Sequence, residues 1–315
     1  MNLRRIAPVL VLLAAGAVAL RGRSAKADDP DPKGRNERCA TRLSITLLGK
    51  SADAALLAAA KPEDSIDSML TSPAFYDRLA SFVNAQSNGA PAASPLQDPV
   101  YFLARHMIEQ RKPWRDLYIG AYNVRAATDG KSLEVVEDAN GLGYFRTAPW
   151  MVRYAGNESE GVRISAAYHM IHDTTGFQVP ASVAKPGEDR TATGRKADAC
   201  KNCHFDSWFA LDKAAAVLSR KKVAADGTVT FDPTTITATT LLNKNLASDK
   251  DLVTTLVSSD AWKFTQCRMV FNFLYGRPEN QCEAPLFDQC VAALEKDGTI
   301  NAALAVVVKD ASFCQ

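Results

Sequence analysis

The residues whose types and spacing most clearly indicate chemistry are Cys200, Cys203 and His204, in the sequence Cys200-Lys201-Asn202-Cys203-His204. Positions three and four apart share one face of a helical turn, so the two thiols and the imidazole would point the same way. Cys-x-x-Cys-His is the pattern of c-type haem attachment. Two thiols add across the vinyl groups of haem, and the histidine supplies the proximal iron ligand. The motif predicts one covalently attached haem c, with the iron on His204.

Three other interpretations of the cysteine pair compete with haem: a thiol redox pair, a structural disulfide, and half of a zinc site. A redox pair would be expected beside a βαβ pattern, which this region lacks. Zinc would need a second cluster of Cys or His nearby. We therefore favour haem attachment.

The second axial ligand of the iron has several candidates. His169, Met170 and His172 lie close together upstream, and the two histidines share a helix face. Met269 lies 65 positions after His204, a separation that small c-type cytochromes often show between their two ligands. Its segment is strongly apolar, however, and methionine in such a segment usually fills a core. A distal methionine raises the reduction potential, a histidine lowers it, and an open position would permit binding of small ligands.

The start of the chain has the layout of a secretory signal peptide. Arg4 and Arg5 precede an apolar run over residues 6–20 and small residues that end at Ala27, after which we expect cleavage. At about 1.5 Å per residue the run is shorter than the roughly 30 Å bilayer core. We therefore expect no transmembrane segment in the mature chain and a periplasmic or extracellular location.

Removal of residues 1–27 takes away five of the 37 basic residues and none of the 35 acidic ones, so the mature chain is mildly acidic. Nucleic-acid binding, which needs a basic patch or stripe, is not expected. The remaining 288 residues are enough to bury a core in one or two domains.

Helix-start signals predict a mainly α fold. N-cap residues precede proline at Ser72-Pro73 and Asp98-Pro99, and Lys112-Pro113 starts another turn. One short β-hairpin is predicted over residues 222–231, around Asp226-Gly227. The helices expected from these patterns cover residues 74–83, 100–110, 158–172, 210–218, 249–258, 260–275, 286–296 and 300–309.

The same patterns divide the chain into regions. We expect a signal peptide (1–27), a disordered segment (28–36), an N-terminal helical region (37–140), a cytochrome c-like helical haem domain (141–245) and a C-terminal helical domain stapled by disulfides (246–315). The N-terminal helical region carries no chemistry that its residues identify.

Five cysteines remain outside the haem motif: Cys39, Cys267, Cys282, Cys290 and Cys314. Outside the cytoplasm, unpaired thiols tend to be oxidised. Because four of the five lie near the C-terminus, we expect two disulfides there and Cys39 left over. Sequence alone does not determine which cysteines pair.

Three segments together resemble the large exported cytochrome-like proteins of planctomycetes, verrucomicrobia and related bacteria. They are TAPWMVRYAG at 147–156 leading into GVR at 161–163, the haem motif, and residues 264–277 with their Tyr-Gly-Arg end, followed by DASF at 310–313. The resemblance covers about residues 140–315. It implies a monohaem c-type domain followed by a small helical domain, and no established reaction. The chain lacks the histidine before the first haem cysteine and the Asp-Pro-x-Gly-Phe segment after the motif that such proteins usually have.

These features together predict an exported monohaem cytochrome that transfers electrons to or from a redox partner protein, and is an electron carrier rather than a catalyst. Two alternatives stay open. One is a haem enzyme, either peroxidase-like or a periplasmic oxidase subunit. The other is an interaction protein with a structural haem, which would assemble with other exported proteins.

Overall fold

The computed structural model describes residues 31–87, 98–128, 132–154, 163–179, 186–223, 229–232 and 236–315. The expected signal peptide lies outside these residues. The α-helices are α1 (Pro32–Leu43), α2 (Ala54–Leu57), α3 (Ile66–Met69), α4 (Pro73–Ser87), α5 (Pro99–Glu109), α6 (Asp116–Ile119), α7 (Ala148–Tyr154), α8 (Ile164–Thr175), α9 (Asp198–Lys201), α10 (Leu211–Ala216), α11 (Asp249–Val257), α12 (Asp260–Tyr275), α13 (Ala284–Asp297) and α14 (Ile300–Val308). Short 3₁₀ or π turns are η1 (Ser44–Leu48), η2 (Pro62–Ser65), η4 (Gly194–Lys196), η5 (Asn202–Asp206), η7 (Gln281–Glu283) and η8 (Ala311–Cys314). The strands are β1 (Tyr122–Ala126), β2 (Leu133–Glu137), β3 (Arg220–Val223), β4 (Val229–Asp232), β5 (Thr239–Leu241) and β6 (Lys244–Leu246).

The expected mainly α fold is confirmed. Within the described residues the strands form three separate antiparallel pairs, β1–β2, β3–β4 and β5–β6. The pair β3–β4 is the predicted hairpin, although its turn lies outside the described residues. The pair β5–β6 turns through Leu242 and Asn243, both with positive φ. No helix in the described part of the chain has the length and apolar character that crossing a membrane requires.

Capping residues set the ends of α12 and α8. Ser259 begins α12 by accepting a hydrogen bond from the backbone N–H of Trp262, and Gly276, with φ of 68°, ends it. Gly176, with φ of 67°, ends α8 as expected. The first part of the helix predicted over residues 158–172 lies outside the described residues.

The segment expected to be disordered, residues 28–36, is helical from Pro32 onward, so that expectation is wrong for residues 32–36. The side chain of Asp31 accepts a hydrogen bond from the N–H of Gly34 at 2.9 Å and caps α1. Pro32 occupies the first helical position, where its missing N–H costs no hydrogen bond.

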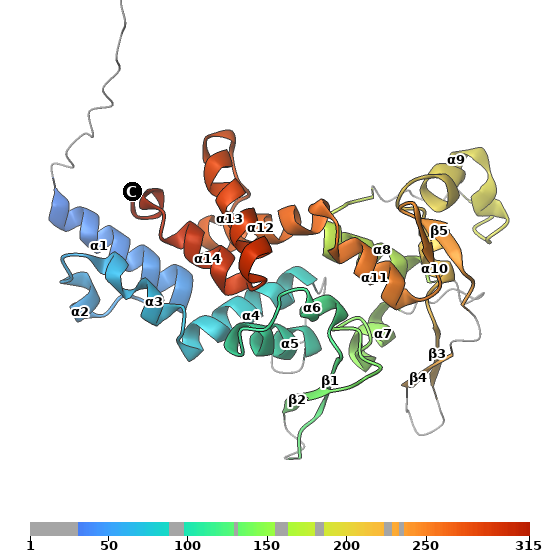
Figure 1. Cartoon of the computed structure of the whole chain (residues 1–315), viewed down its shortest axis with the longest axis horizontal. Helices are drawn as coiled ribbons and strands as arrows, with labels where there is room; N and C mark the ends of the chain where they lie inside the picture. The colour runs from blue at the N-terminus through green and yellow to red at the C-terminus, as the bar shows by residue number, and fades with distance from the viewer. Residues whose placement is uncertain are drawn as a thin grey trace, which may run out of the picture.

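The buried apolar side chains form one connected core that runs from Cys39 to Cys314. Figure 1 shows α12, α13 and α14 between α1–α3 at one end and α8–α11 at the other. At its centre, Oε1 of Gln266 accepts hydrogen bonds from the indole N–H of Trp114 (2.8 Å) and the hydroxyl of Tyr118 (3.1 Å). The three predicted regions 37–140, 141–245 and 246–315 therefore all contribute to this core.

Two disulfides are present, Cys39–Cys314 and Cys267–Cys290. The expectation that Cys39 is left over is wrong, because α1 lies beside η8 in space and brings Cys39 to Cys314. The cysteine left over is Cys282, which is exposed.

Candidate haem attachment site

The motif occupies one continuous helical segment formed by α9 and η5. The carbonyl of Ala197 accepts hydrogen bonds from the N–H groups of Cys200 (2.9 Å) and Lys201 (2.8 Å). Cys200, Cys203 and His204 are therefore spaced to share a face of the segment. Both cysteines are half-buried and neither is disulfide-bonded, so their thiols are available for thioether formation.

The imidazole of His204 is held by a carboxylate. Its Nδ1 lies 2.7 Å from Oδ2 of Asp212, at the start of α10. Because an ionised carboxylate only accepts hydrogen bonds, Nδ1 carries the proton and donates it. In the neutral imidazole the other ring nitrogen, Nε2, then keeps its lone pair, and this is the tautomer that a metal ligand needs.

Arg195 in η4 holds the same carboxylate. Its Nε lies 3.0 Å from Oδ2 of Asp212 and its Nη2 lies 2.9 Å from Oδ1, so the contact is bidentate. Burial of Asp212 opposes its ionisation, but hydrogen bonds from His204 and Arg195 and the charge of Arg195 outweigh burial, and the pKa of Asp212 lies below its ordinary value. Asp212 is therefore an anion at neutral pH.

An aromatic cluster lies directly after the motif. Phe177, which follows α8, has its ring centroid 4.7 Å from that of Trp208 and 4.5 Å from that of Phe209. Trp208 is 44% exposed, although large aromatic side chains are usually well buried. Two unpaired thiols and an imidazole held through Nδ1 are the donor set that a c-type haem would require.

Two candidates for the second axial ligand, His169 and His172, lie on α8, and α8 packs against α10. The Nδ1 of His172 lies 3.0 Å from Oδ1 of Asp173, and the hydroxyl of Tyr144 donates to Oδ2 of the same carboxylate at 3.0 Å. His169 stacks on Tyr154, with 3.9 Å between ring centroids, and its Nδ1 is buried without a hydrogen-bond partner. Both histidines are thus oriented by neighbouring side chains.

The two methionine candidates differ in burial. Met170 is 2% exposed and belongs to the core, whereas Met269 on α12 is partly buried and packs against that core. Both side chains have apolar neighbours, as methionines that fill a core do. Met170 is the more deeply buried of the two, so burial argues more strongly against Met170 as a ligand than against Met269.

His169, His172 and Asp173 also form the one group of side chains around α8 that could hold a metal ion, with ligand atoms all within 4.8 Å of one another in the described part of the chain. The carboxylate of Asp173 is already engaged by Tyr144 and His172. Its hydrogen bonds account for the cluster without an ion.

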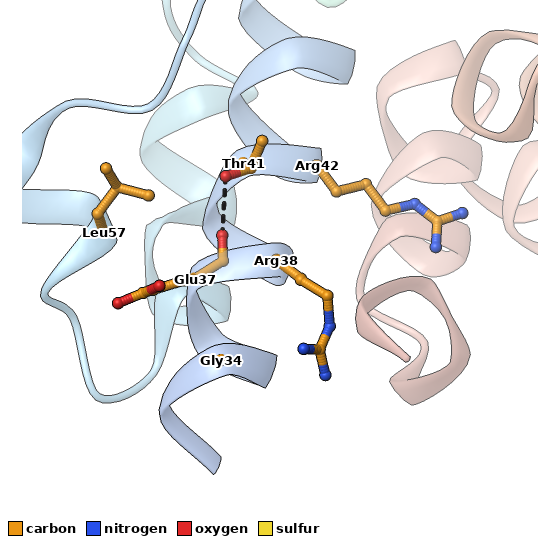
Figure 2. Close-up of a pocket in the computed structure, with 6 residues that line it drawn as sticks. All are labelled: Gly34, Glu37, Arg38, Thr41, Arg42 and Leu57. Atoms are coloured by element: carbon orange, nitrogen blue, oxygen red, sulfur yellow. Dashed lines mark hydrogen bonds between the residues drawn. The ribbon is translucent and has the colours of Figure 1, made fainter. Parts of the chain in front are cut away.

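A surface hollow lies far from the motif, along α1 (Figure 2). On the α1 side of it, the hydroxyl of Thr41 donates to the carbonyl of Glu37, one turn earlier in the same helix, at 2.8 Å. Arg42 points away toward the C-terminal helices, where its guanidinium lies 4.5 Å from the centre of the Phe313 ring. The residues that line the hollow are Gly34, Glu37, Arg38, Thr41, Arg42 and Leu57. Since α1 and α9 lie at opposite ends of the molecule in Figure 1, the hollow has no part in the motif's chemistry.

Sequence reasoning missed Asp212, which is hydrogen-bonded to His204, and Arg195, which is paired with Asp212. Asp212 follows His204 by eight positions at the start of a predicted helix, where an acidic residue is ordinary. Arg195 precedes Cys200 by five positions, in a segment that lies outside the predicted helices. The available signal in the sequence was a basic residue before the motif and an acidic residue after it, which could pair beside His204.

The chain shows no significant match to any protein-family model, to any curated protein or to any solved structure. The functional assignment therefore depends on the residues and their geometry.

Proposed function

We propose that the chain is an exported c-type cytochrome that carries one haem on Cys200, Cys203 and His204 and transfers electrons to or from a partner protein. The observation that supports this most directly is the combination of two unpaired thiols with an imidazole whose Nδ1 is held by Asp212. A thiol redox pair or a structural disulfide would not need an oriented imidazole beside it. The resemblance to exported cytochrome-like proteins is part of the same proposal.

Each residue of the site has a separate task. Cys200 and Cys203 anchor the group covalently, and His204 offers Nε2 to the iron. Asp212 keeps the proton on Nδ1 and fixes the direction of the ring. Bound haem supplies a one-electron Fe(III)/Fe(II) couple. Phe177 and Phe209 exclude water on one side, while the exposed Trp208 provides an apolar edge at which a redox partner can approach.

Export is supported by the cysteine chemistry of the described residues. Two disulfides staple the fold, and disulfides form and persist mainly outside the cytoplasm. Attachment of haem to c-type proteins takes place in the same compartment. The proposed signal peptide at residues 1–27 would direct the chain there.

A haem enzyme is the second candidate, and the arrangement on α8 favours it. His172 and Asp173 form a hydrogen-bonded pair on the helix next to α10, and an imidazole–carboxylate pair is suited to acid–base catalysis at an open distal position. In that case the iron would have one protein ligand.

The visible spectrum of the matured protein separates the two functions. An electron carrier with two protein ligands is expected to give low-spin spectra in both oxidation states, with no change when cyanide or hydrogen peroxide is added. A high-spin spectrum that responds to both reagents would contradict the carrier function and support the haem enzyme.

A further inference from the structure

We propose that Asp212 makes His204 an electron-rich ligand and so sets a low reduction potential for the haem, while Arg195 moderates that effect. This inference rests on the proposed haem attachment. It goes further by assigning two residues outside the motif to the control of the redox couple.

The first step concerns the acceptor of the His204 proton. Oδ2 of Asp212 lies 2.7 Å from Nδ1, at the short end of the range for a charge-assisted hydrogen bond. The Asp212 side chain is only 8% exposed, so bulk water screens its charge weakly. An anionic acceptor draws the Nδ1 proton toward itself and leaves the imidazole more negative. A backbone carbonyl, which is neutral, would do this less.

The second step concerns the iron. A more negative imidazole donates more electron density through Nε2 and stabilises Fe(III) relative to Fe(II). Hydrogen bonding to the axial ligand and burial are two of the means by which a protein sets a haem potential. Asp212 supplies both, because its carboxylate is 8% exposed, paired with the guanidinium of Arg195 and directly hydrogen-bonded to the ligand.

The third step concerns Arg195. Its guanidinium is 13% exposed and contacts both oxygens of Asp212, including the Oδ2 that accepts from His204. It withdraws negative charge from the carboxylate and competes for the oxygen that holds the imidazole. Arg195 also places a positive charge near the site. Both effects favour Fe(II), which is opposite to the effect of Asp212.

The three side chains come from three separate elements: Arg195 from η4, His204 from η5 and Asp212 from α10. Both η4 and α10 pack against η5. Because each is held by a different element, the charges are arranged before haem is attached. A purely structural salt bridge would require only Arg195 and Asp212, and it would not need the hydrogen bond that His204 donates to Asp212.

The test is a potentiometric titration of the matured holoprotein and its variants Asp212→Asn and Arg195→Gln. The change Asp212→Asn keeps the size of the side chain and an oxygen acceptor but removes the charge. We expect the equilibrium constant for reduction to rise by about tenfold in Asp212→Asn, equivalent to about +59 mV for a one-electron couple. In Arg195→Gln we expect it to fall. Arg195→Lys keeps the charge but not the bidentate contact, and should lie between wild type and Arg195→Gln.

Shifts of opposite sign support the inference, because general loosening of the site would move the potential of both variants in the same direction. An unchanged potential in Asp212→Asn, or shifts of the same sign, would overturn it. Covalent haem is measured separately on each preparation by haem staining after denaturing electrophoresis. Haem present with an unchanged potential defeats this inference alone, whereas absence of haem from wild type defeats the proposed function. If Arg195→Gln does not fold, Asp212→Asn and Arg195→Lys still decide the outcome.

Discussion

Cys39 in α1 and Cys314 in η8 are joined by a disulfide although 275 positions separate them. Both side chains are buried. One turn further along α1, the guanidinium of Arg42 lies over the rings of Tyr275 and Phe313 at 5.1 and 4.5 Å from their centres. The first helix of the described chain is thus fastened to its last turn by a covalent bond and by cation–π contacts.

Removal of this link should destabilise the whole fold. We expect Cys39→Ser with Cys314→Ser to lower the free energy of unfolding by about 2–5 kcal/mol, because the unfolded chain loses a constraint and the core gains two polar groups. Urea unfolding of the non-reduced protein measures this decrease in the free energy of unfolding. Cys282→Ser is the matched control, since Cys282 is exposed and unpaired. Equal midpoints for the double variant and the control would contradict the pairing.

The cysteine pairing also predicts the number of reactive thiols under denaturing, non-reducing conditions. Four of the seven cysteines are in disulfides, which leaves Cys200, Cys203 and Cys282. We expect three thiols to react in protein made without haem maturation and one in matured protein. Alkylation followed by peptide mass spectrometry identifies them. Modification of Cys39 in the non-reduced protein would show that the pairing is wrong.

The sequence predicted best the elements whose ends are fixed by neighbouring residues. Helix α12 begins and ends where expected, because Ser259 and Gly276 act on the backbone within one turn. The helices α11, α13 and α14 match their expected ranges to within about two residues at each end for the same reason. The hairpin β5–β6 was missed because Leu242 and Asn243 adopt positive φ without the glycine that usually marks such a turn.

Relationships across the fold could not be predicted from local patterns. The disulfide partner of Cys39 depends on how α1 lies against η8, which only the packed core determines. The motif itself was visible because its three residues lie within five positions of the chain. Its support by Arg195 and Asp212 depends on the packing of η4 and α10 on η5, and sequence spacing carries no such information.

Half-buried His106 should make stability depend on pH. Burial and the nearby charge of Lys112 lower its pKa below the ordinary 6.5, and its Nε2 has no hydrogen-bond partner. The folded state therefore binds fewer protons than the unfolded state as pH falls through this range, so the stabilisation present above pH 6.5 is lost below it. We expect His106→Phe, which keeps the ring contact with Tyr122, to lose less stability than wild type between about pH 7.5 and 5.5. Equal losses in urea unfolding would contradict this.

The distal ligand can be assigned by comparing side chains on α8 and α12. Because α8 packs against α10 and its histidines are oriented by Asp173 and Tyr154, we expect His172→Ala or His169→Ala to convert the low-spin spectrum to high-spin. Met269→Leu, which keeps the apolar volume, should leave the spectrum unchanged. A change of spin state in Met269→Leu alone would place the ligand on α12 and contradict this assignment.

The central claim is that Cys200, Cys203 and His204 hold one haem covalently, and haem staining after denaturing electrophoresis tests it most directly. The chain would be expressed in a host with c-type haem maturation, beside Cys200→Ala with Cys203→Ala and the control Cys282→Ala. We predict one stained band, with the mass of a single haem added, for wild type and Cys282→Ala, and none for the double variant. An unstained wild-type band, or staining that survives in the double variant, would contradict the account.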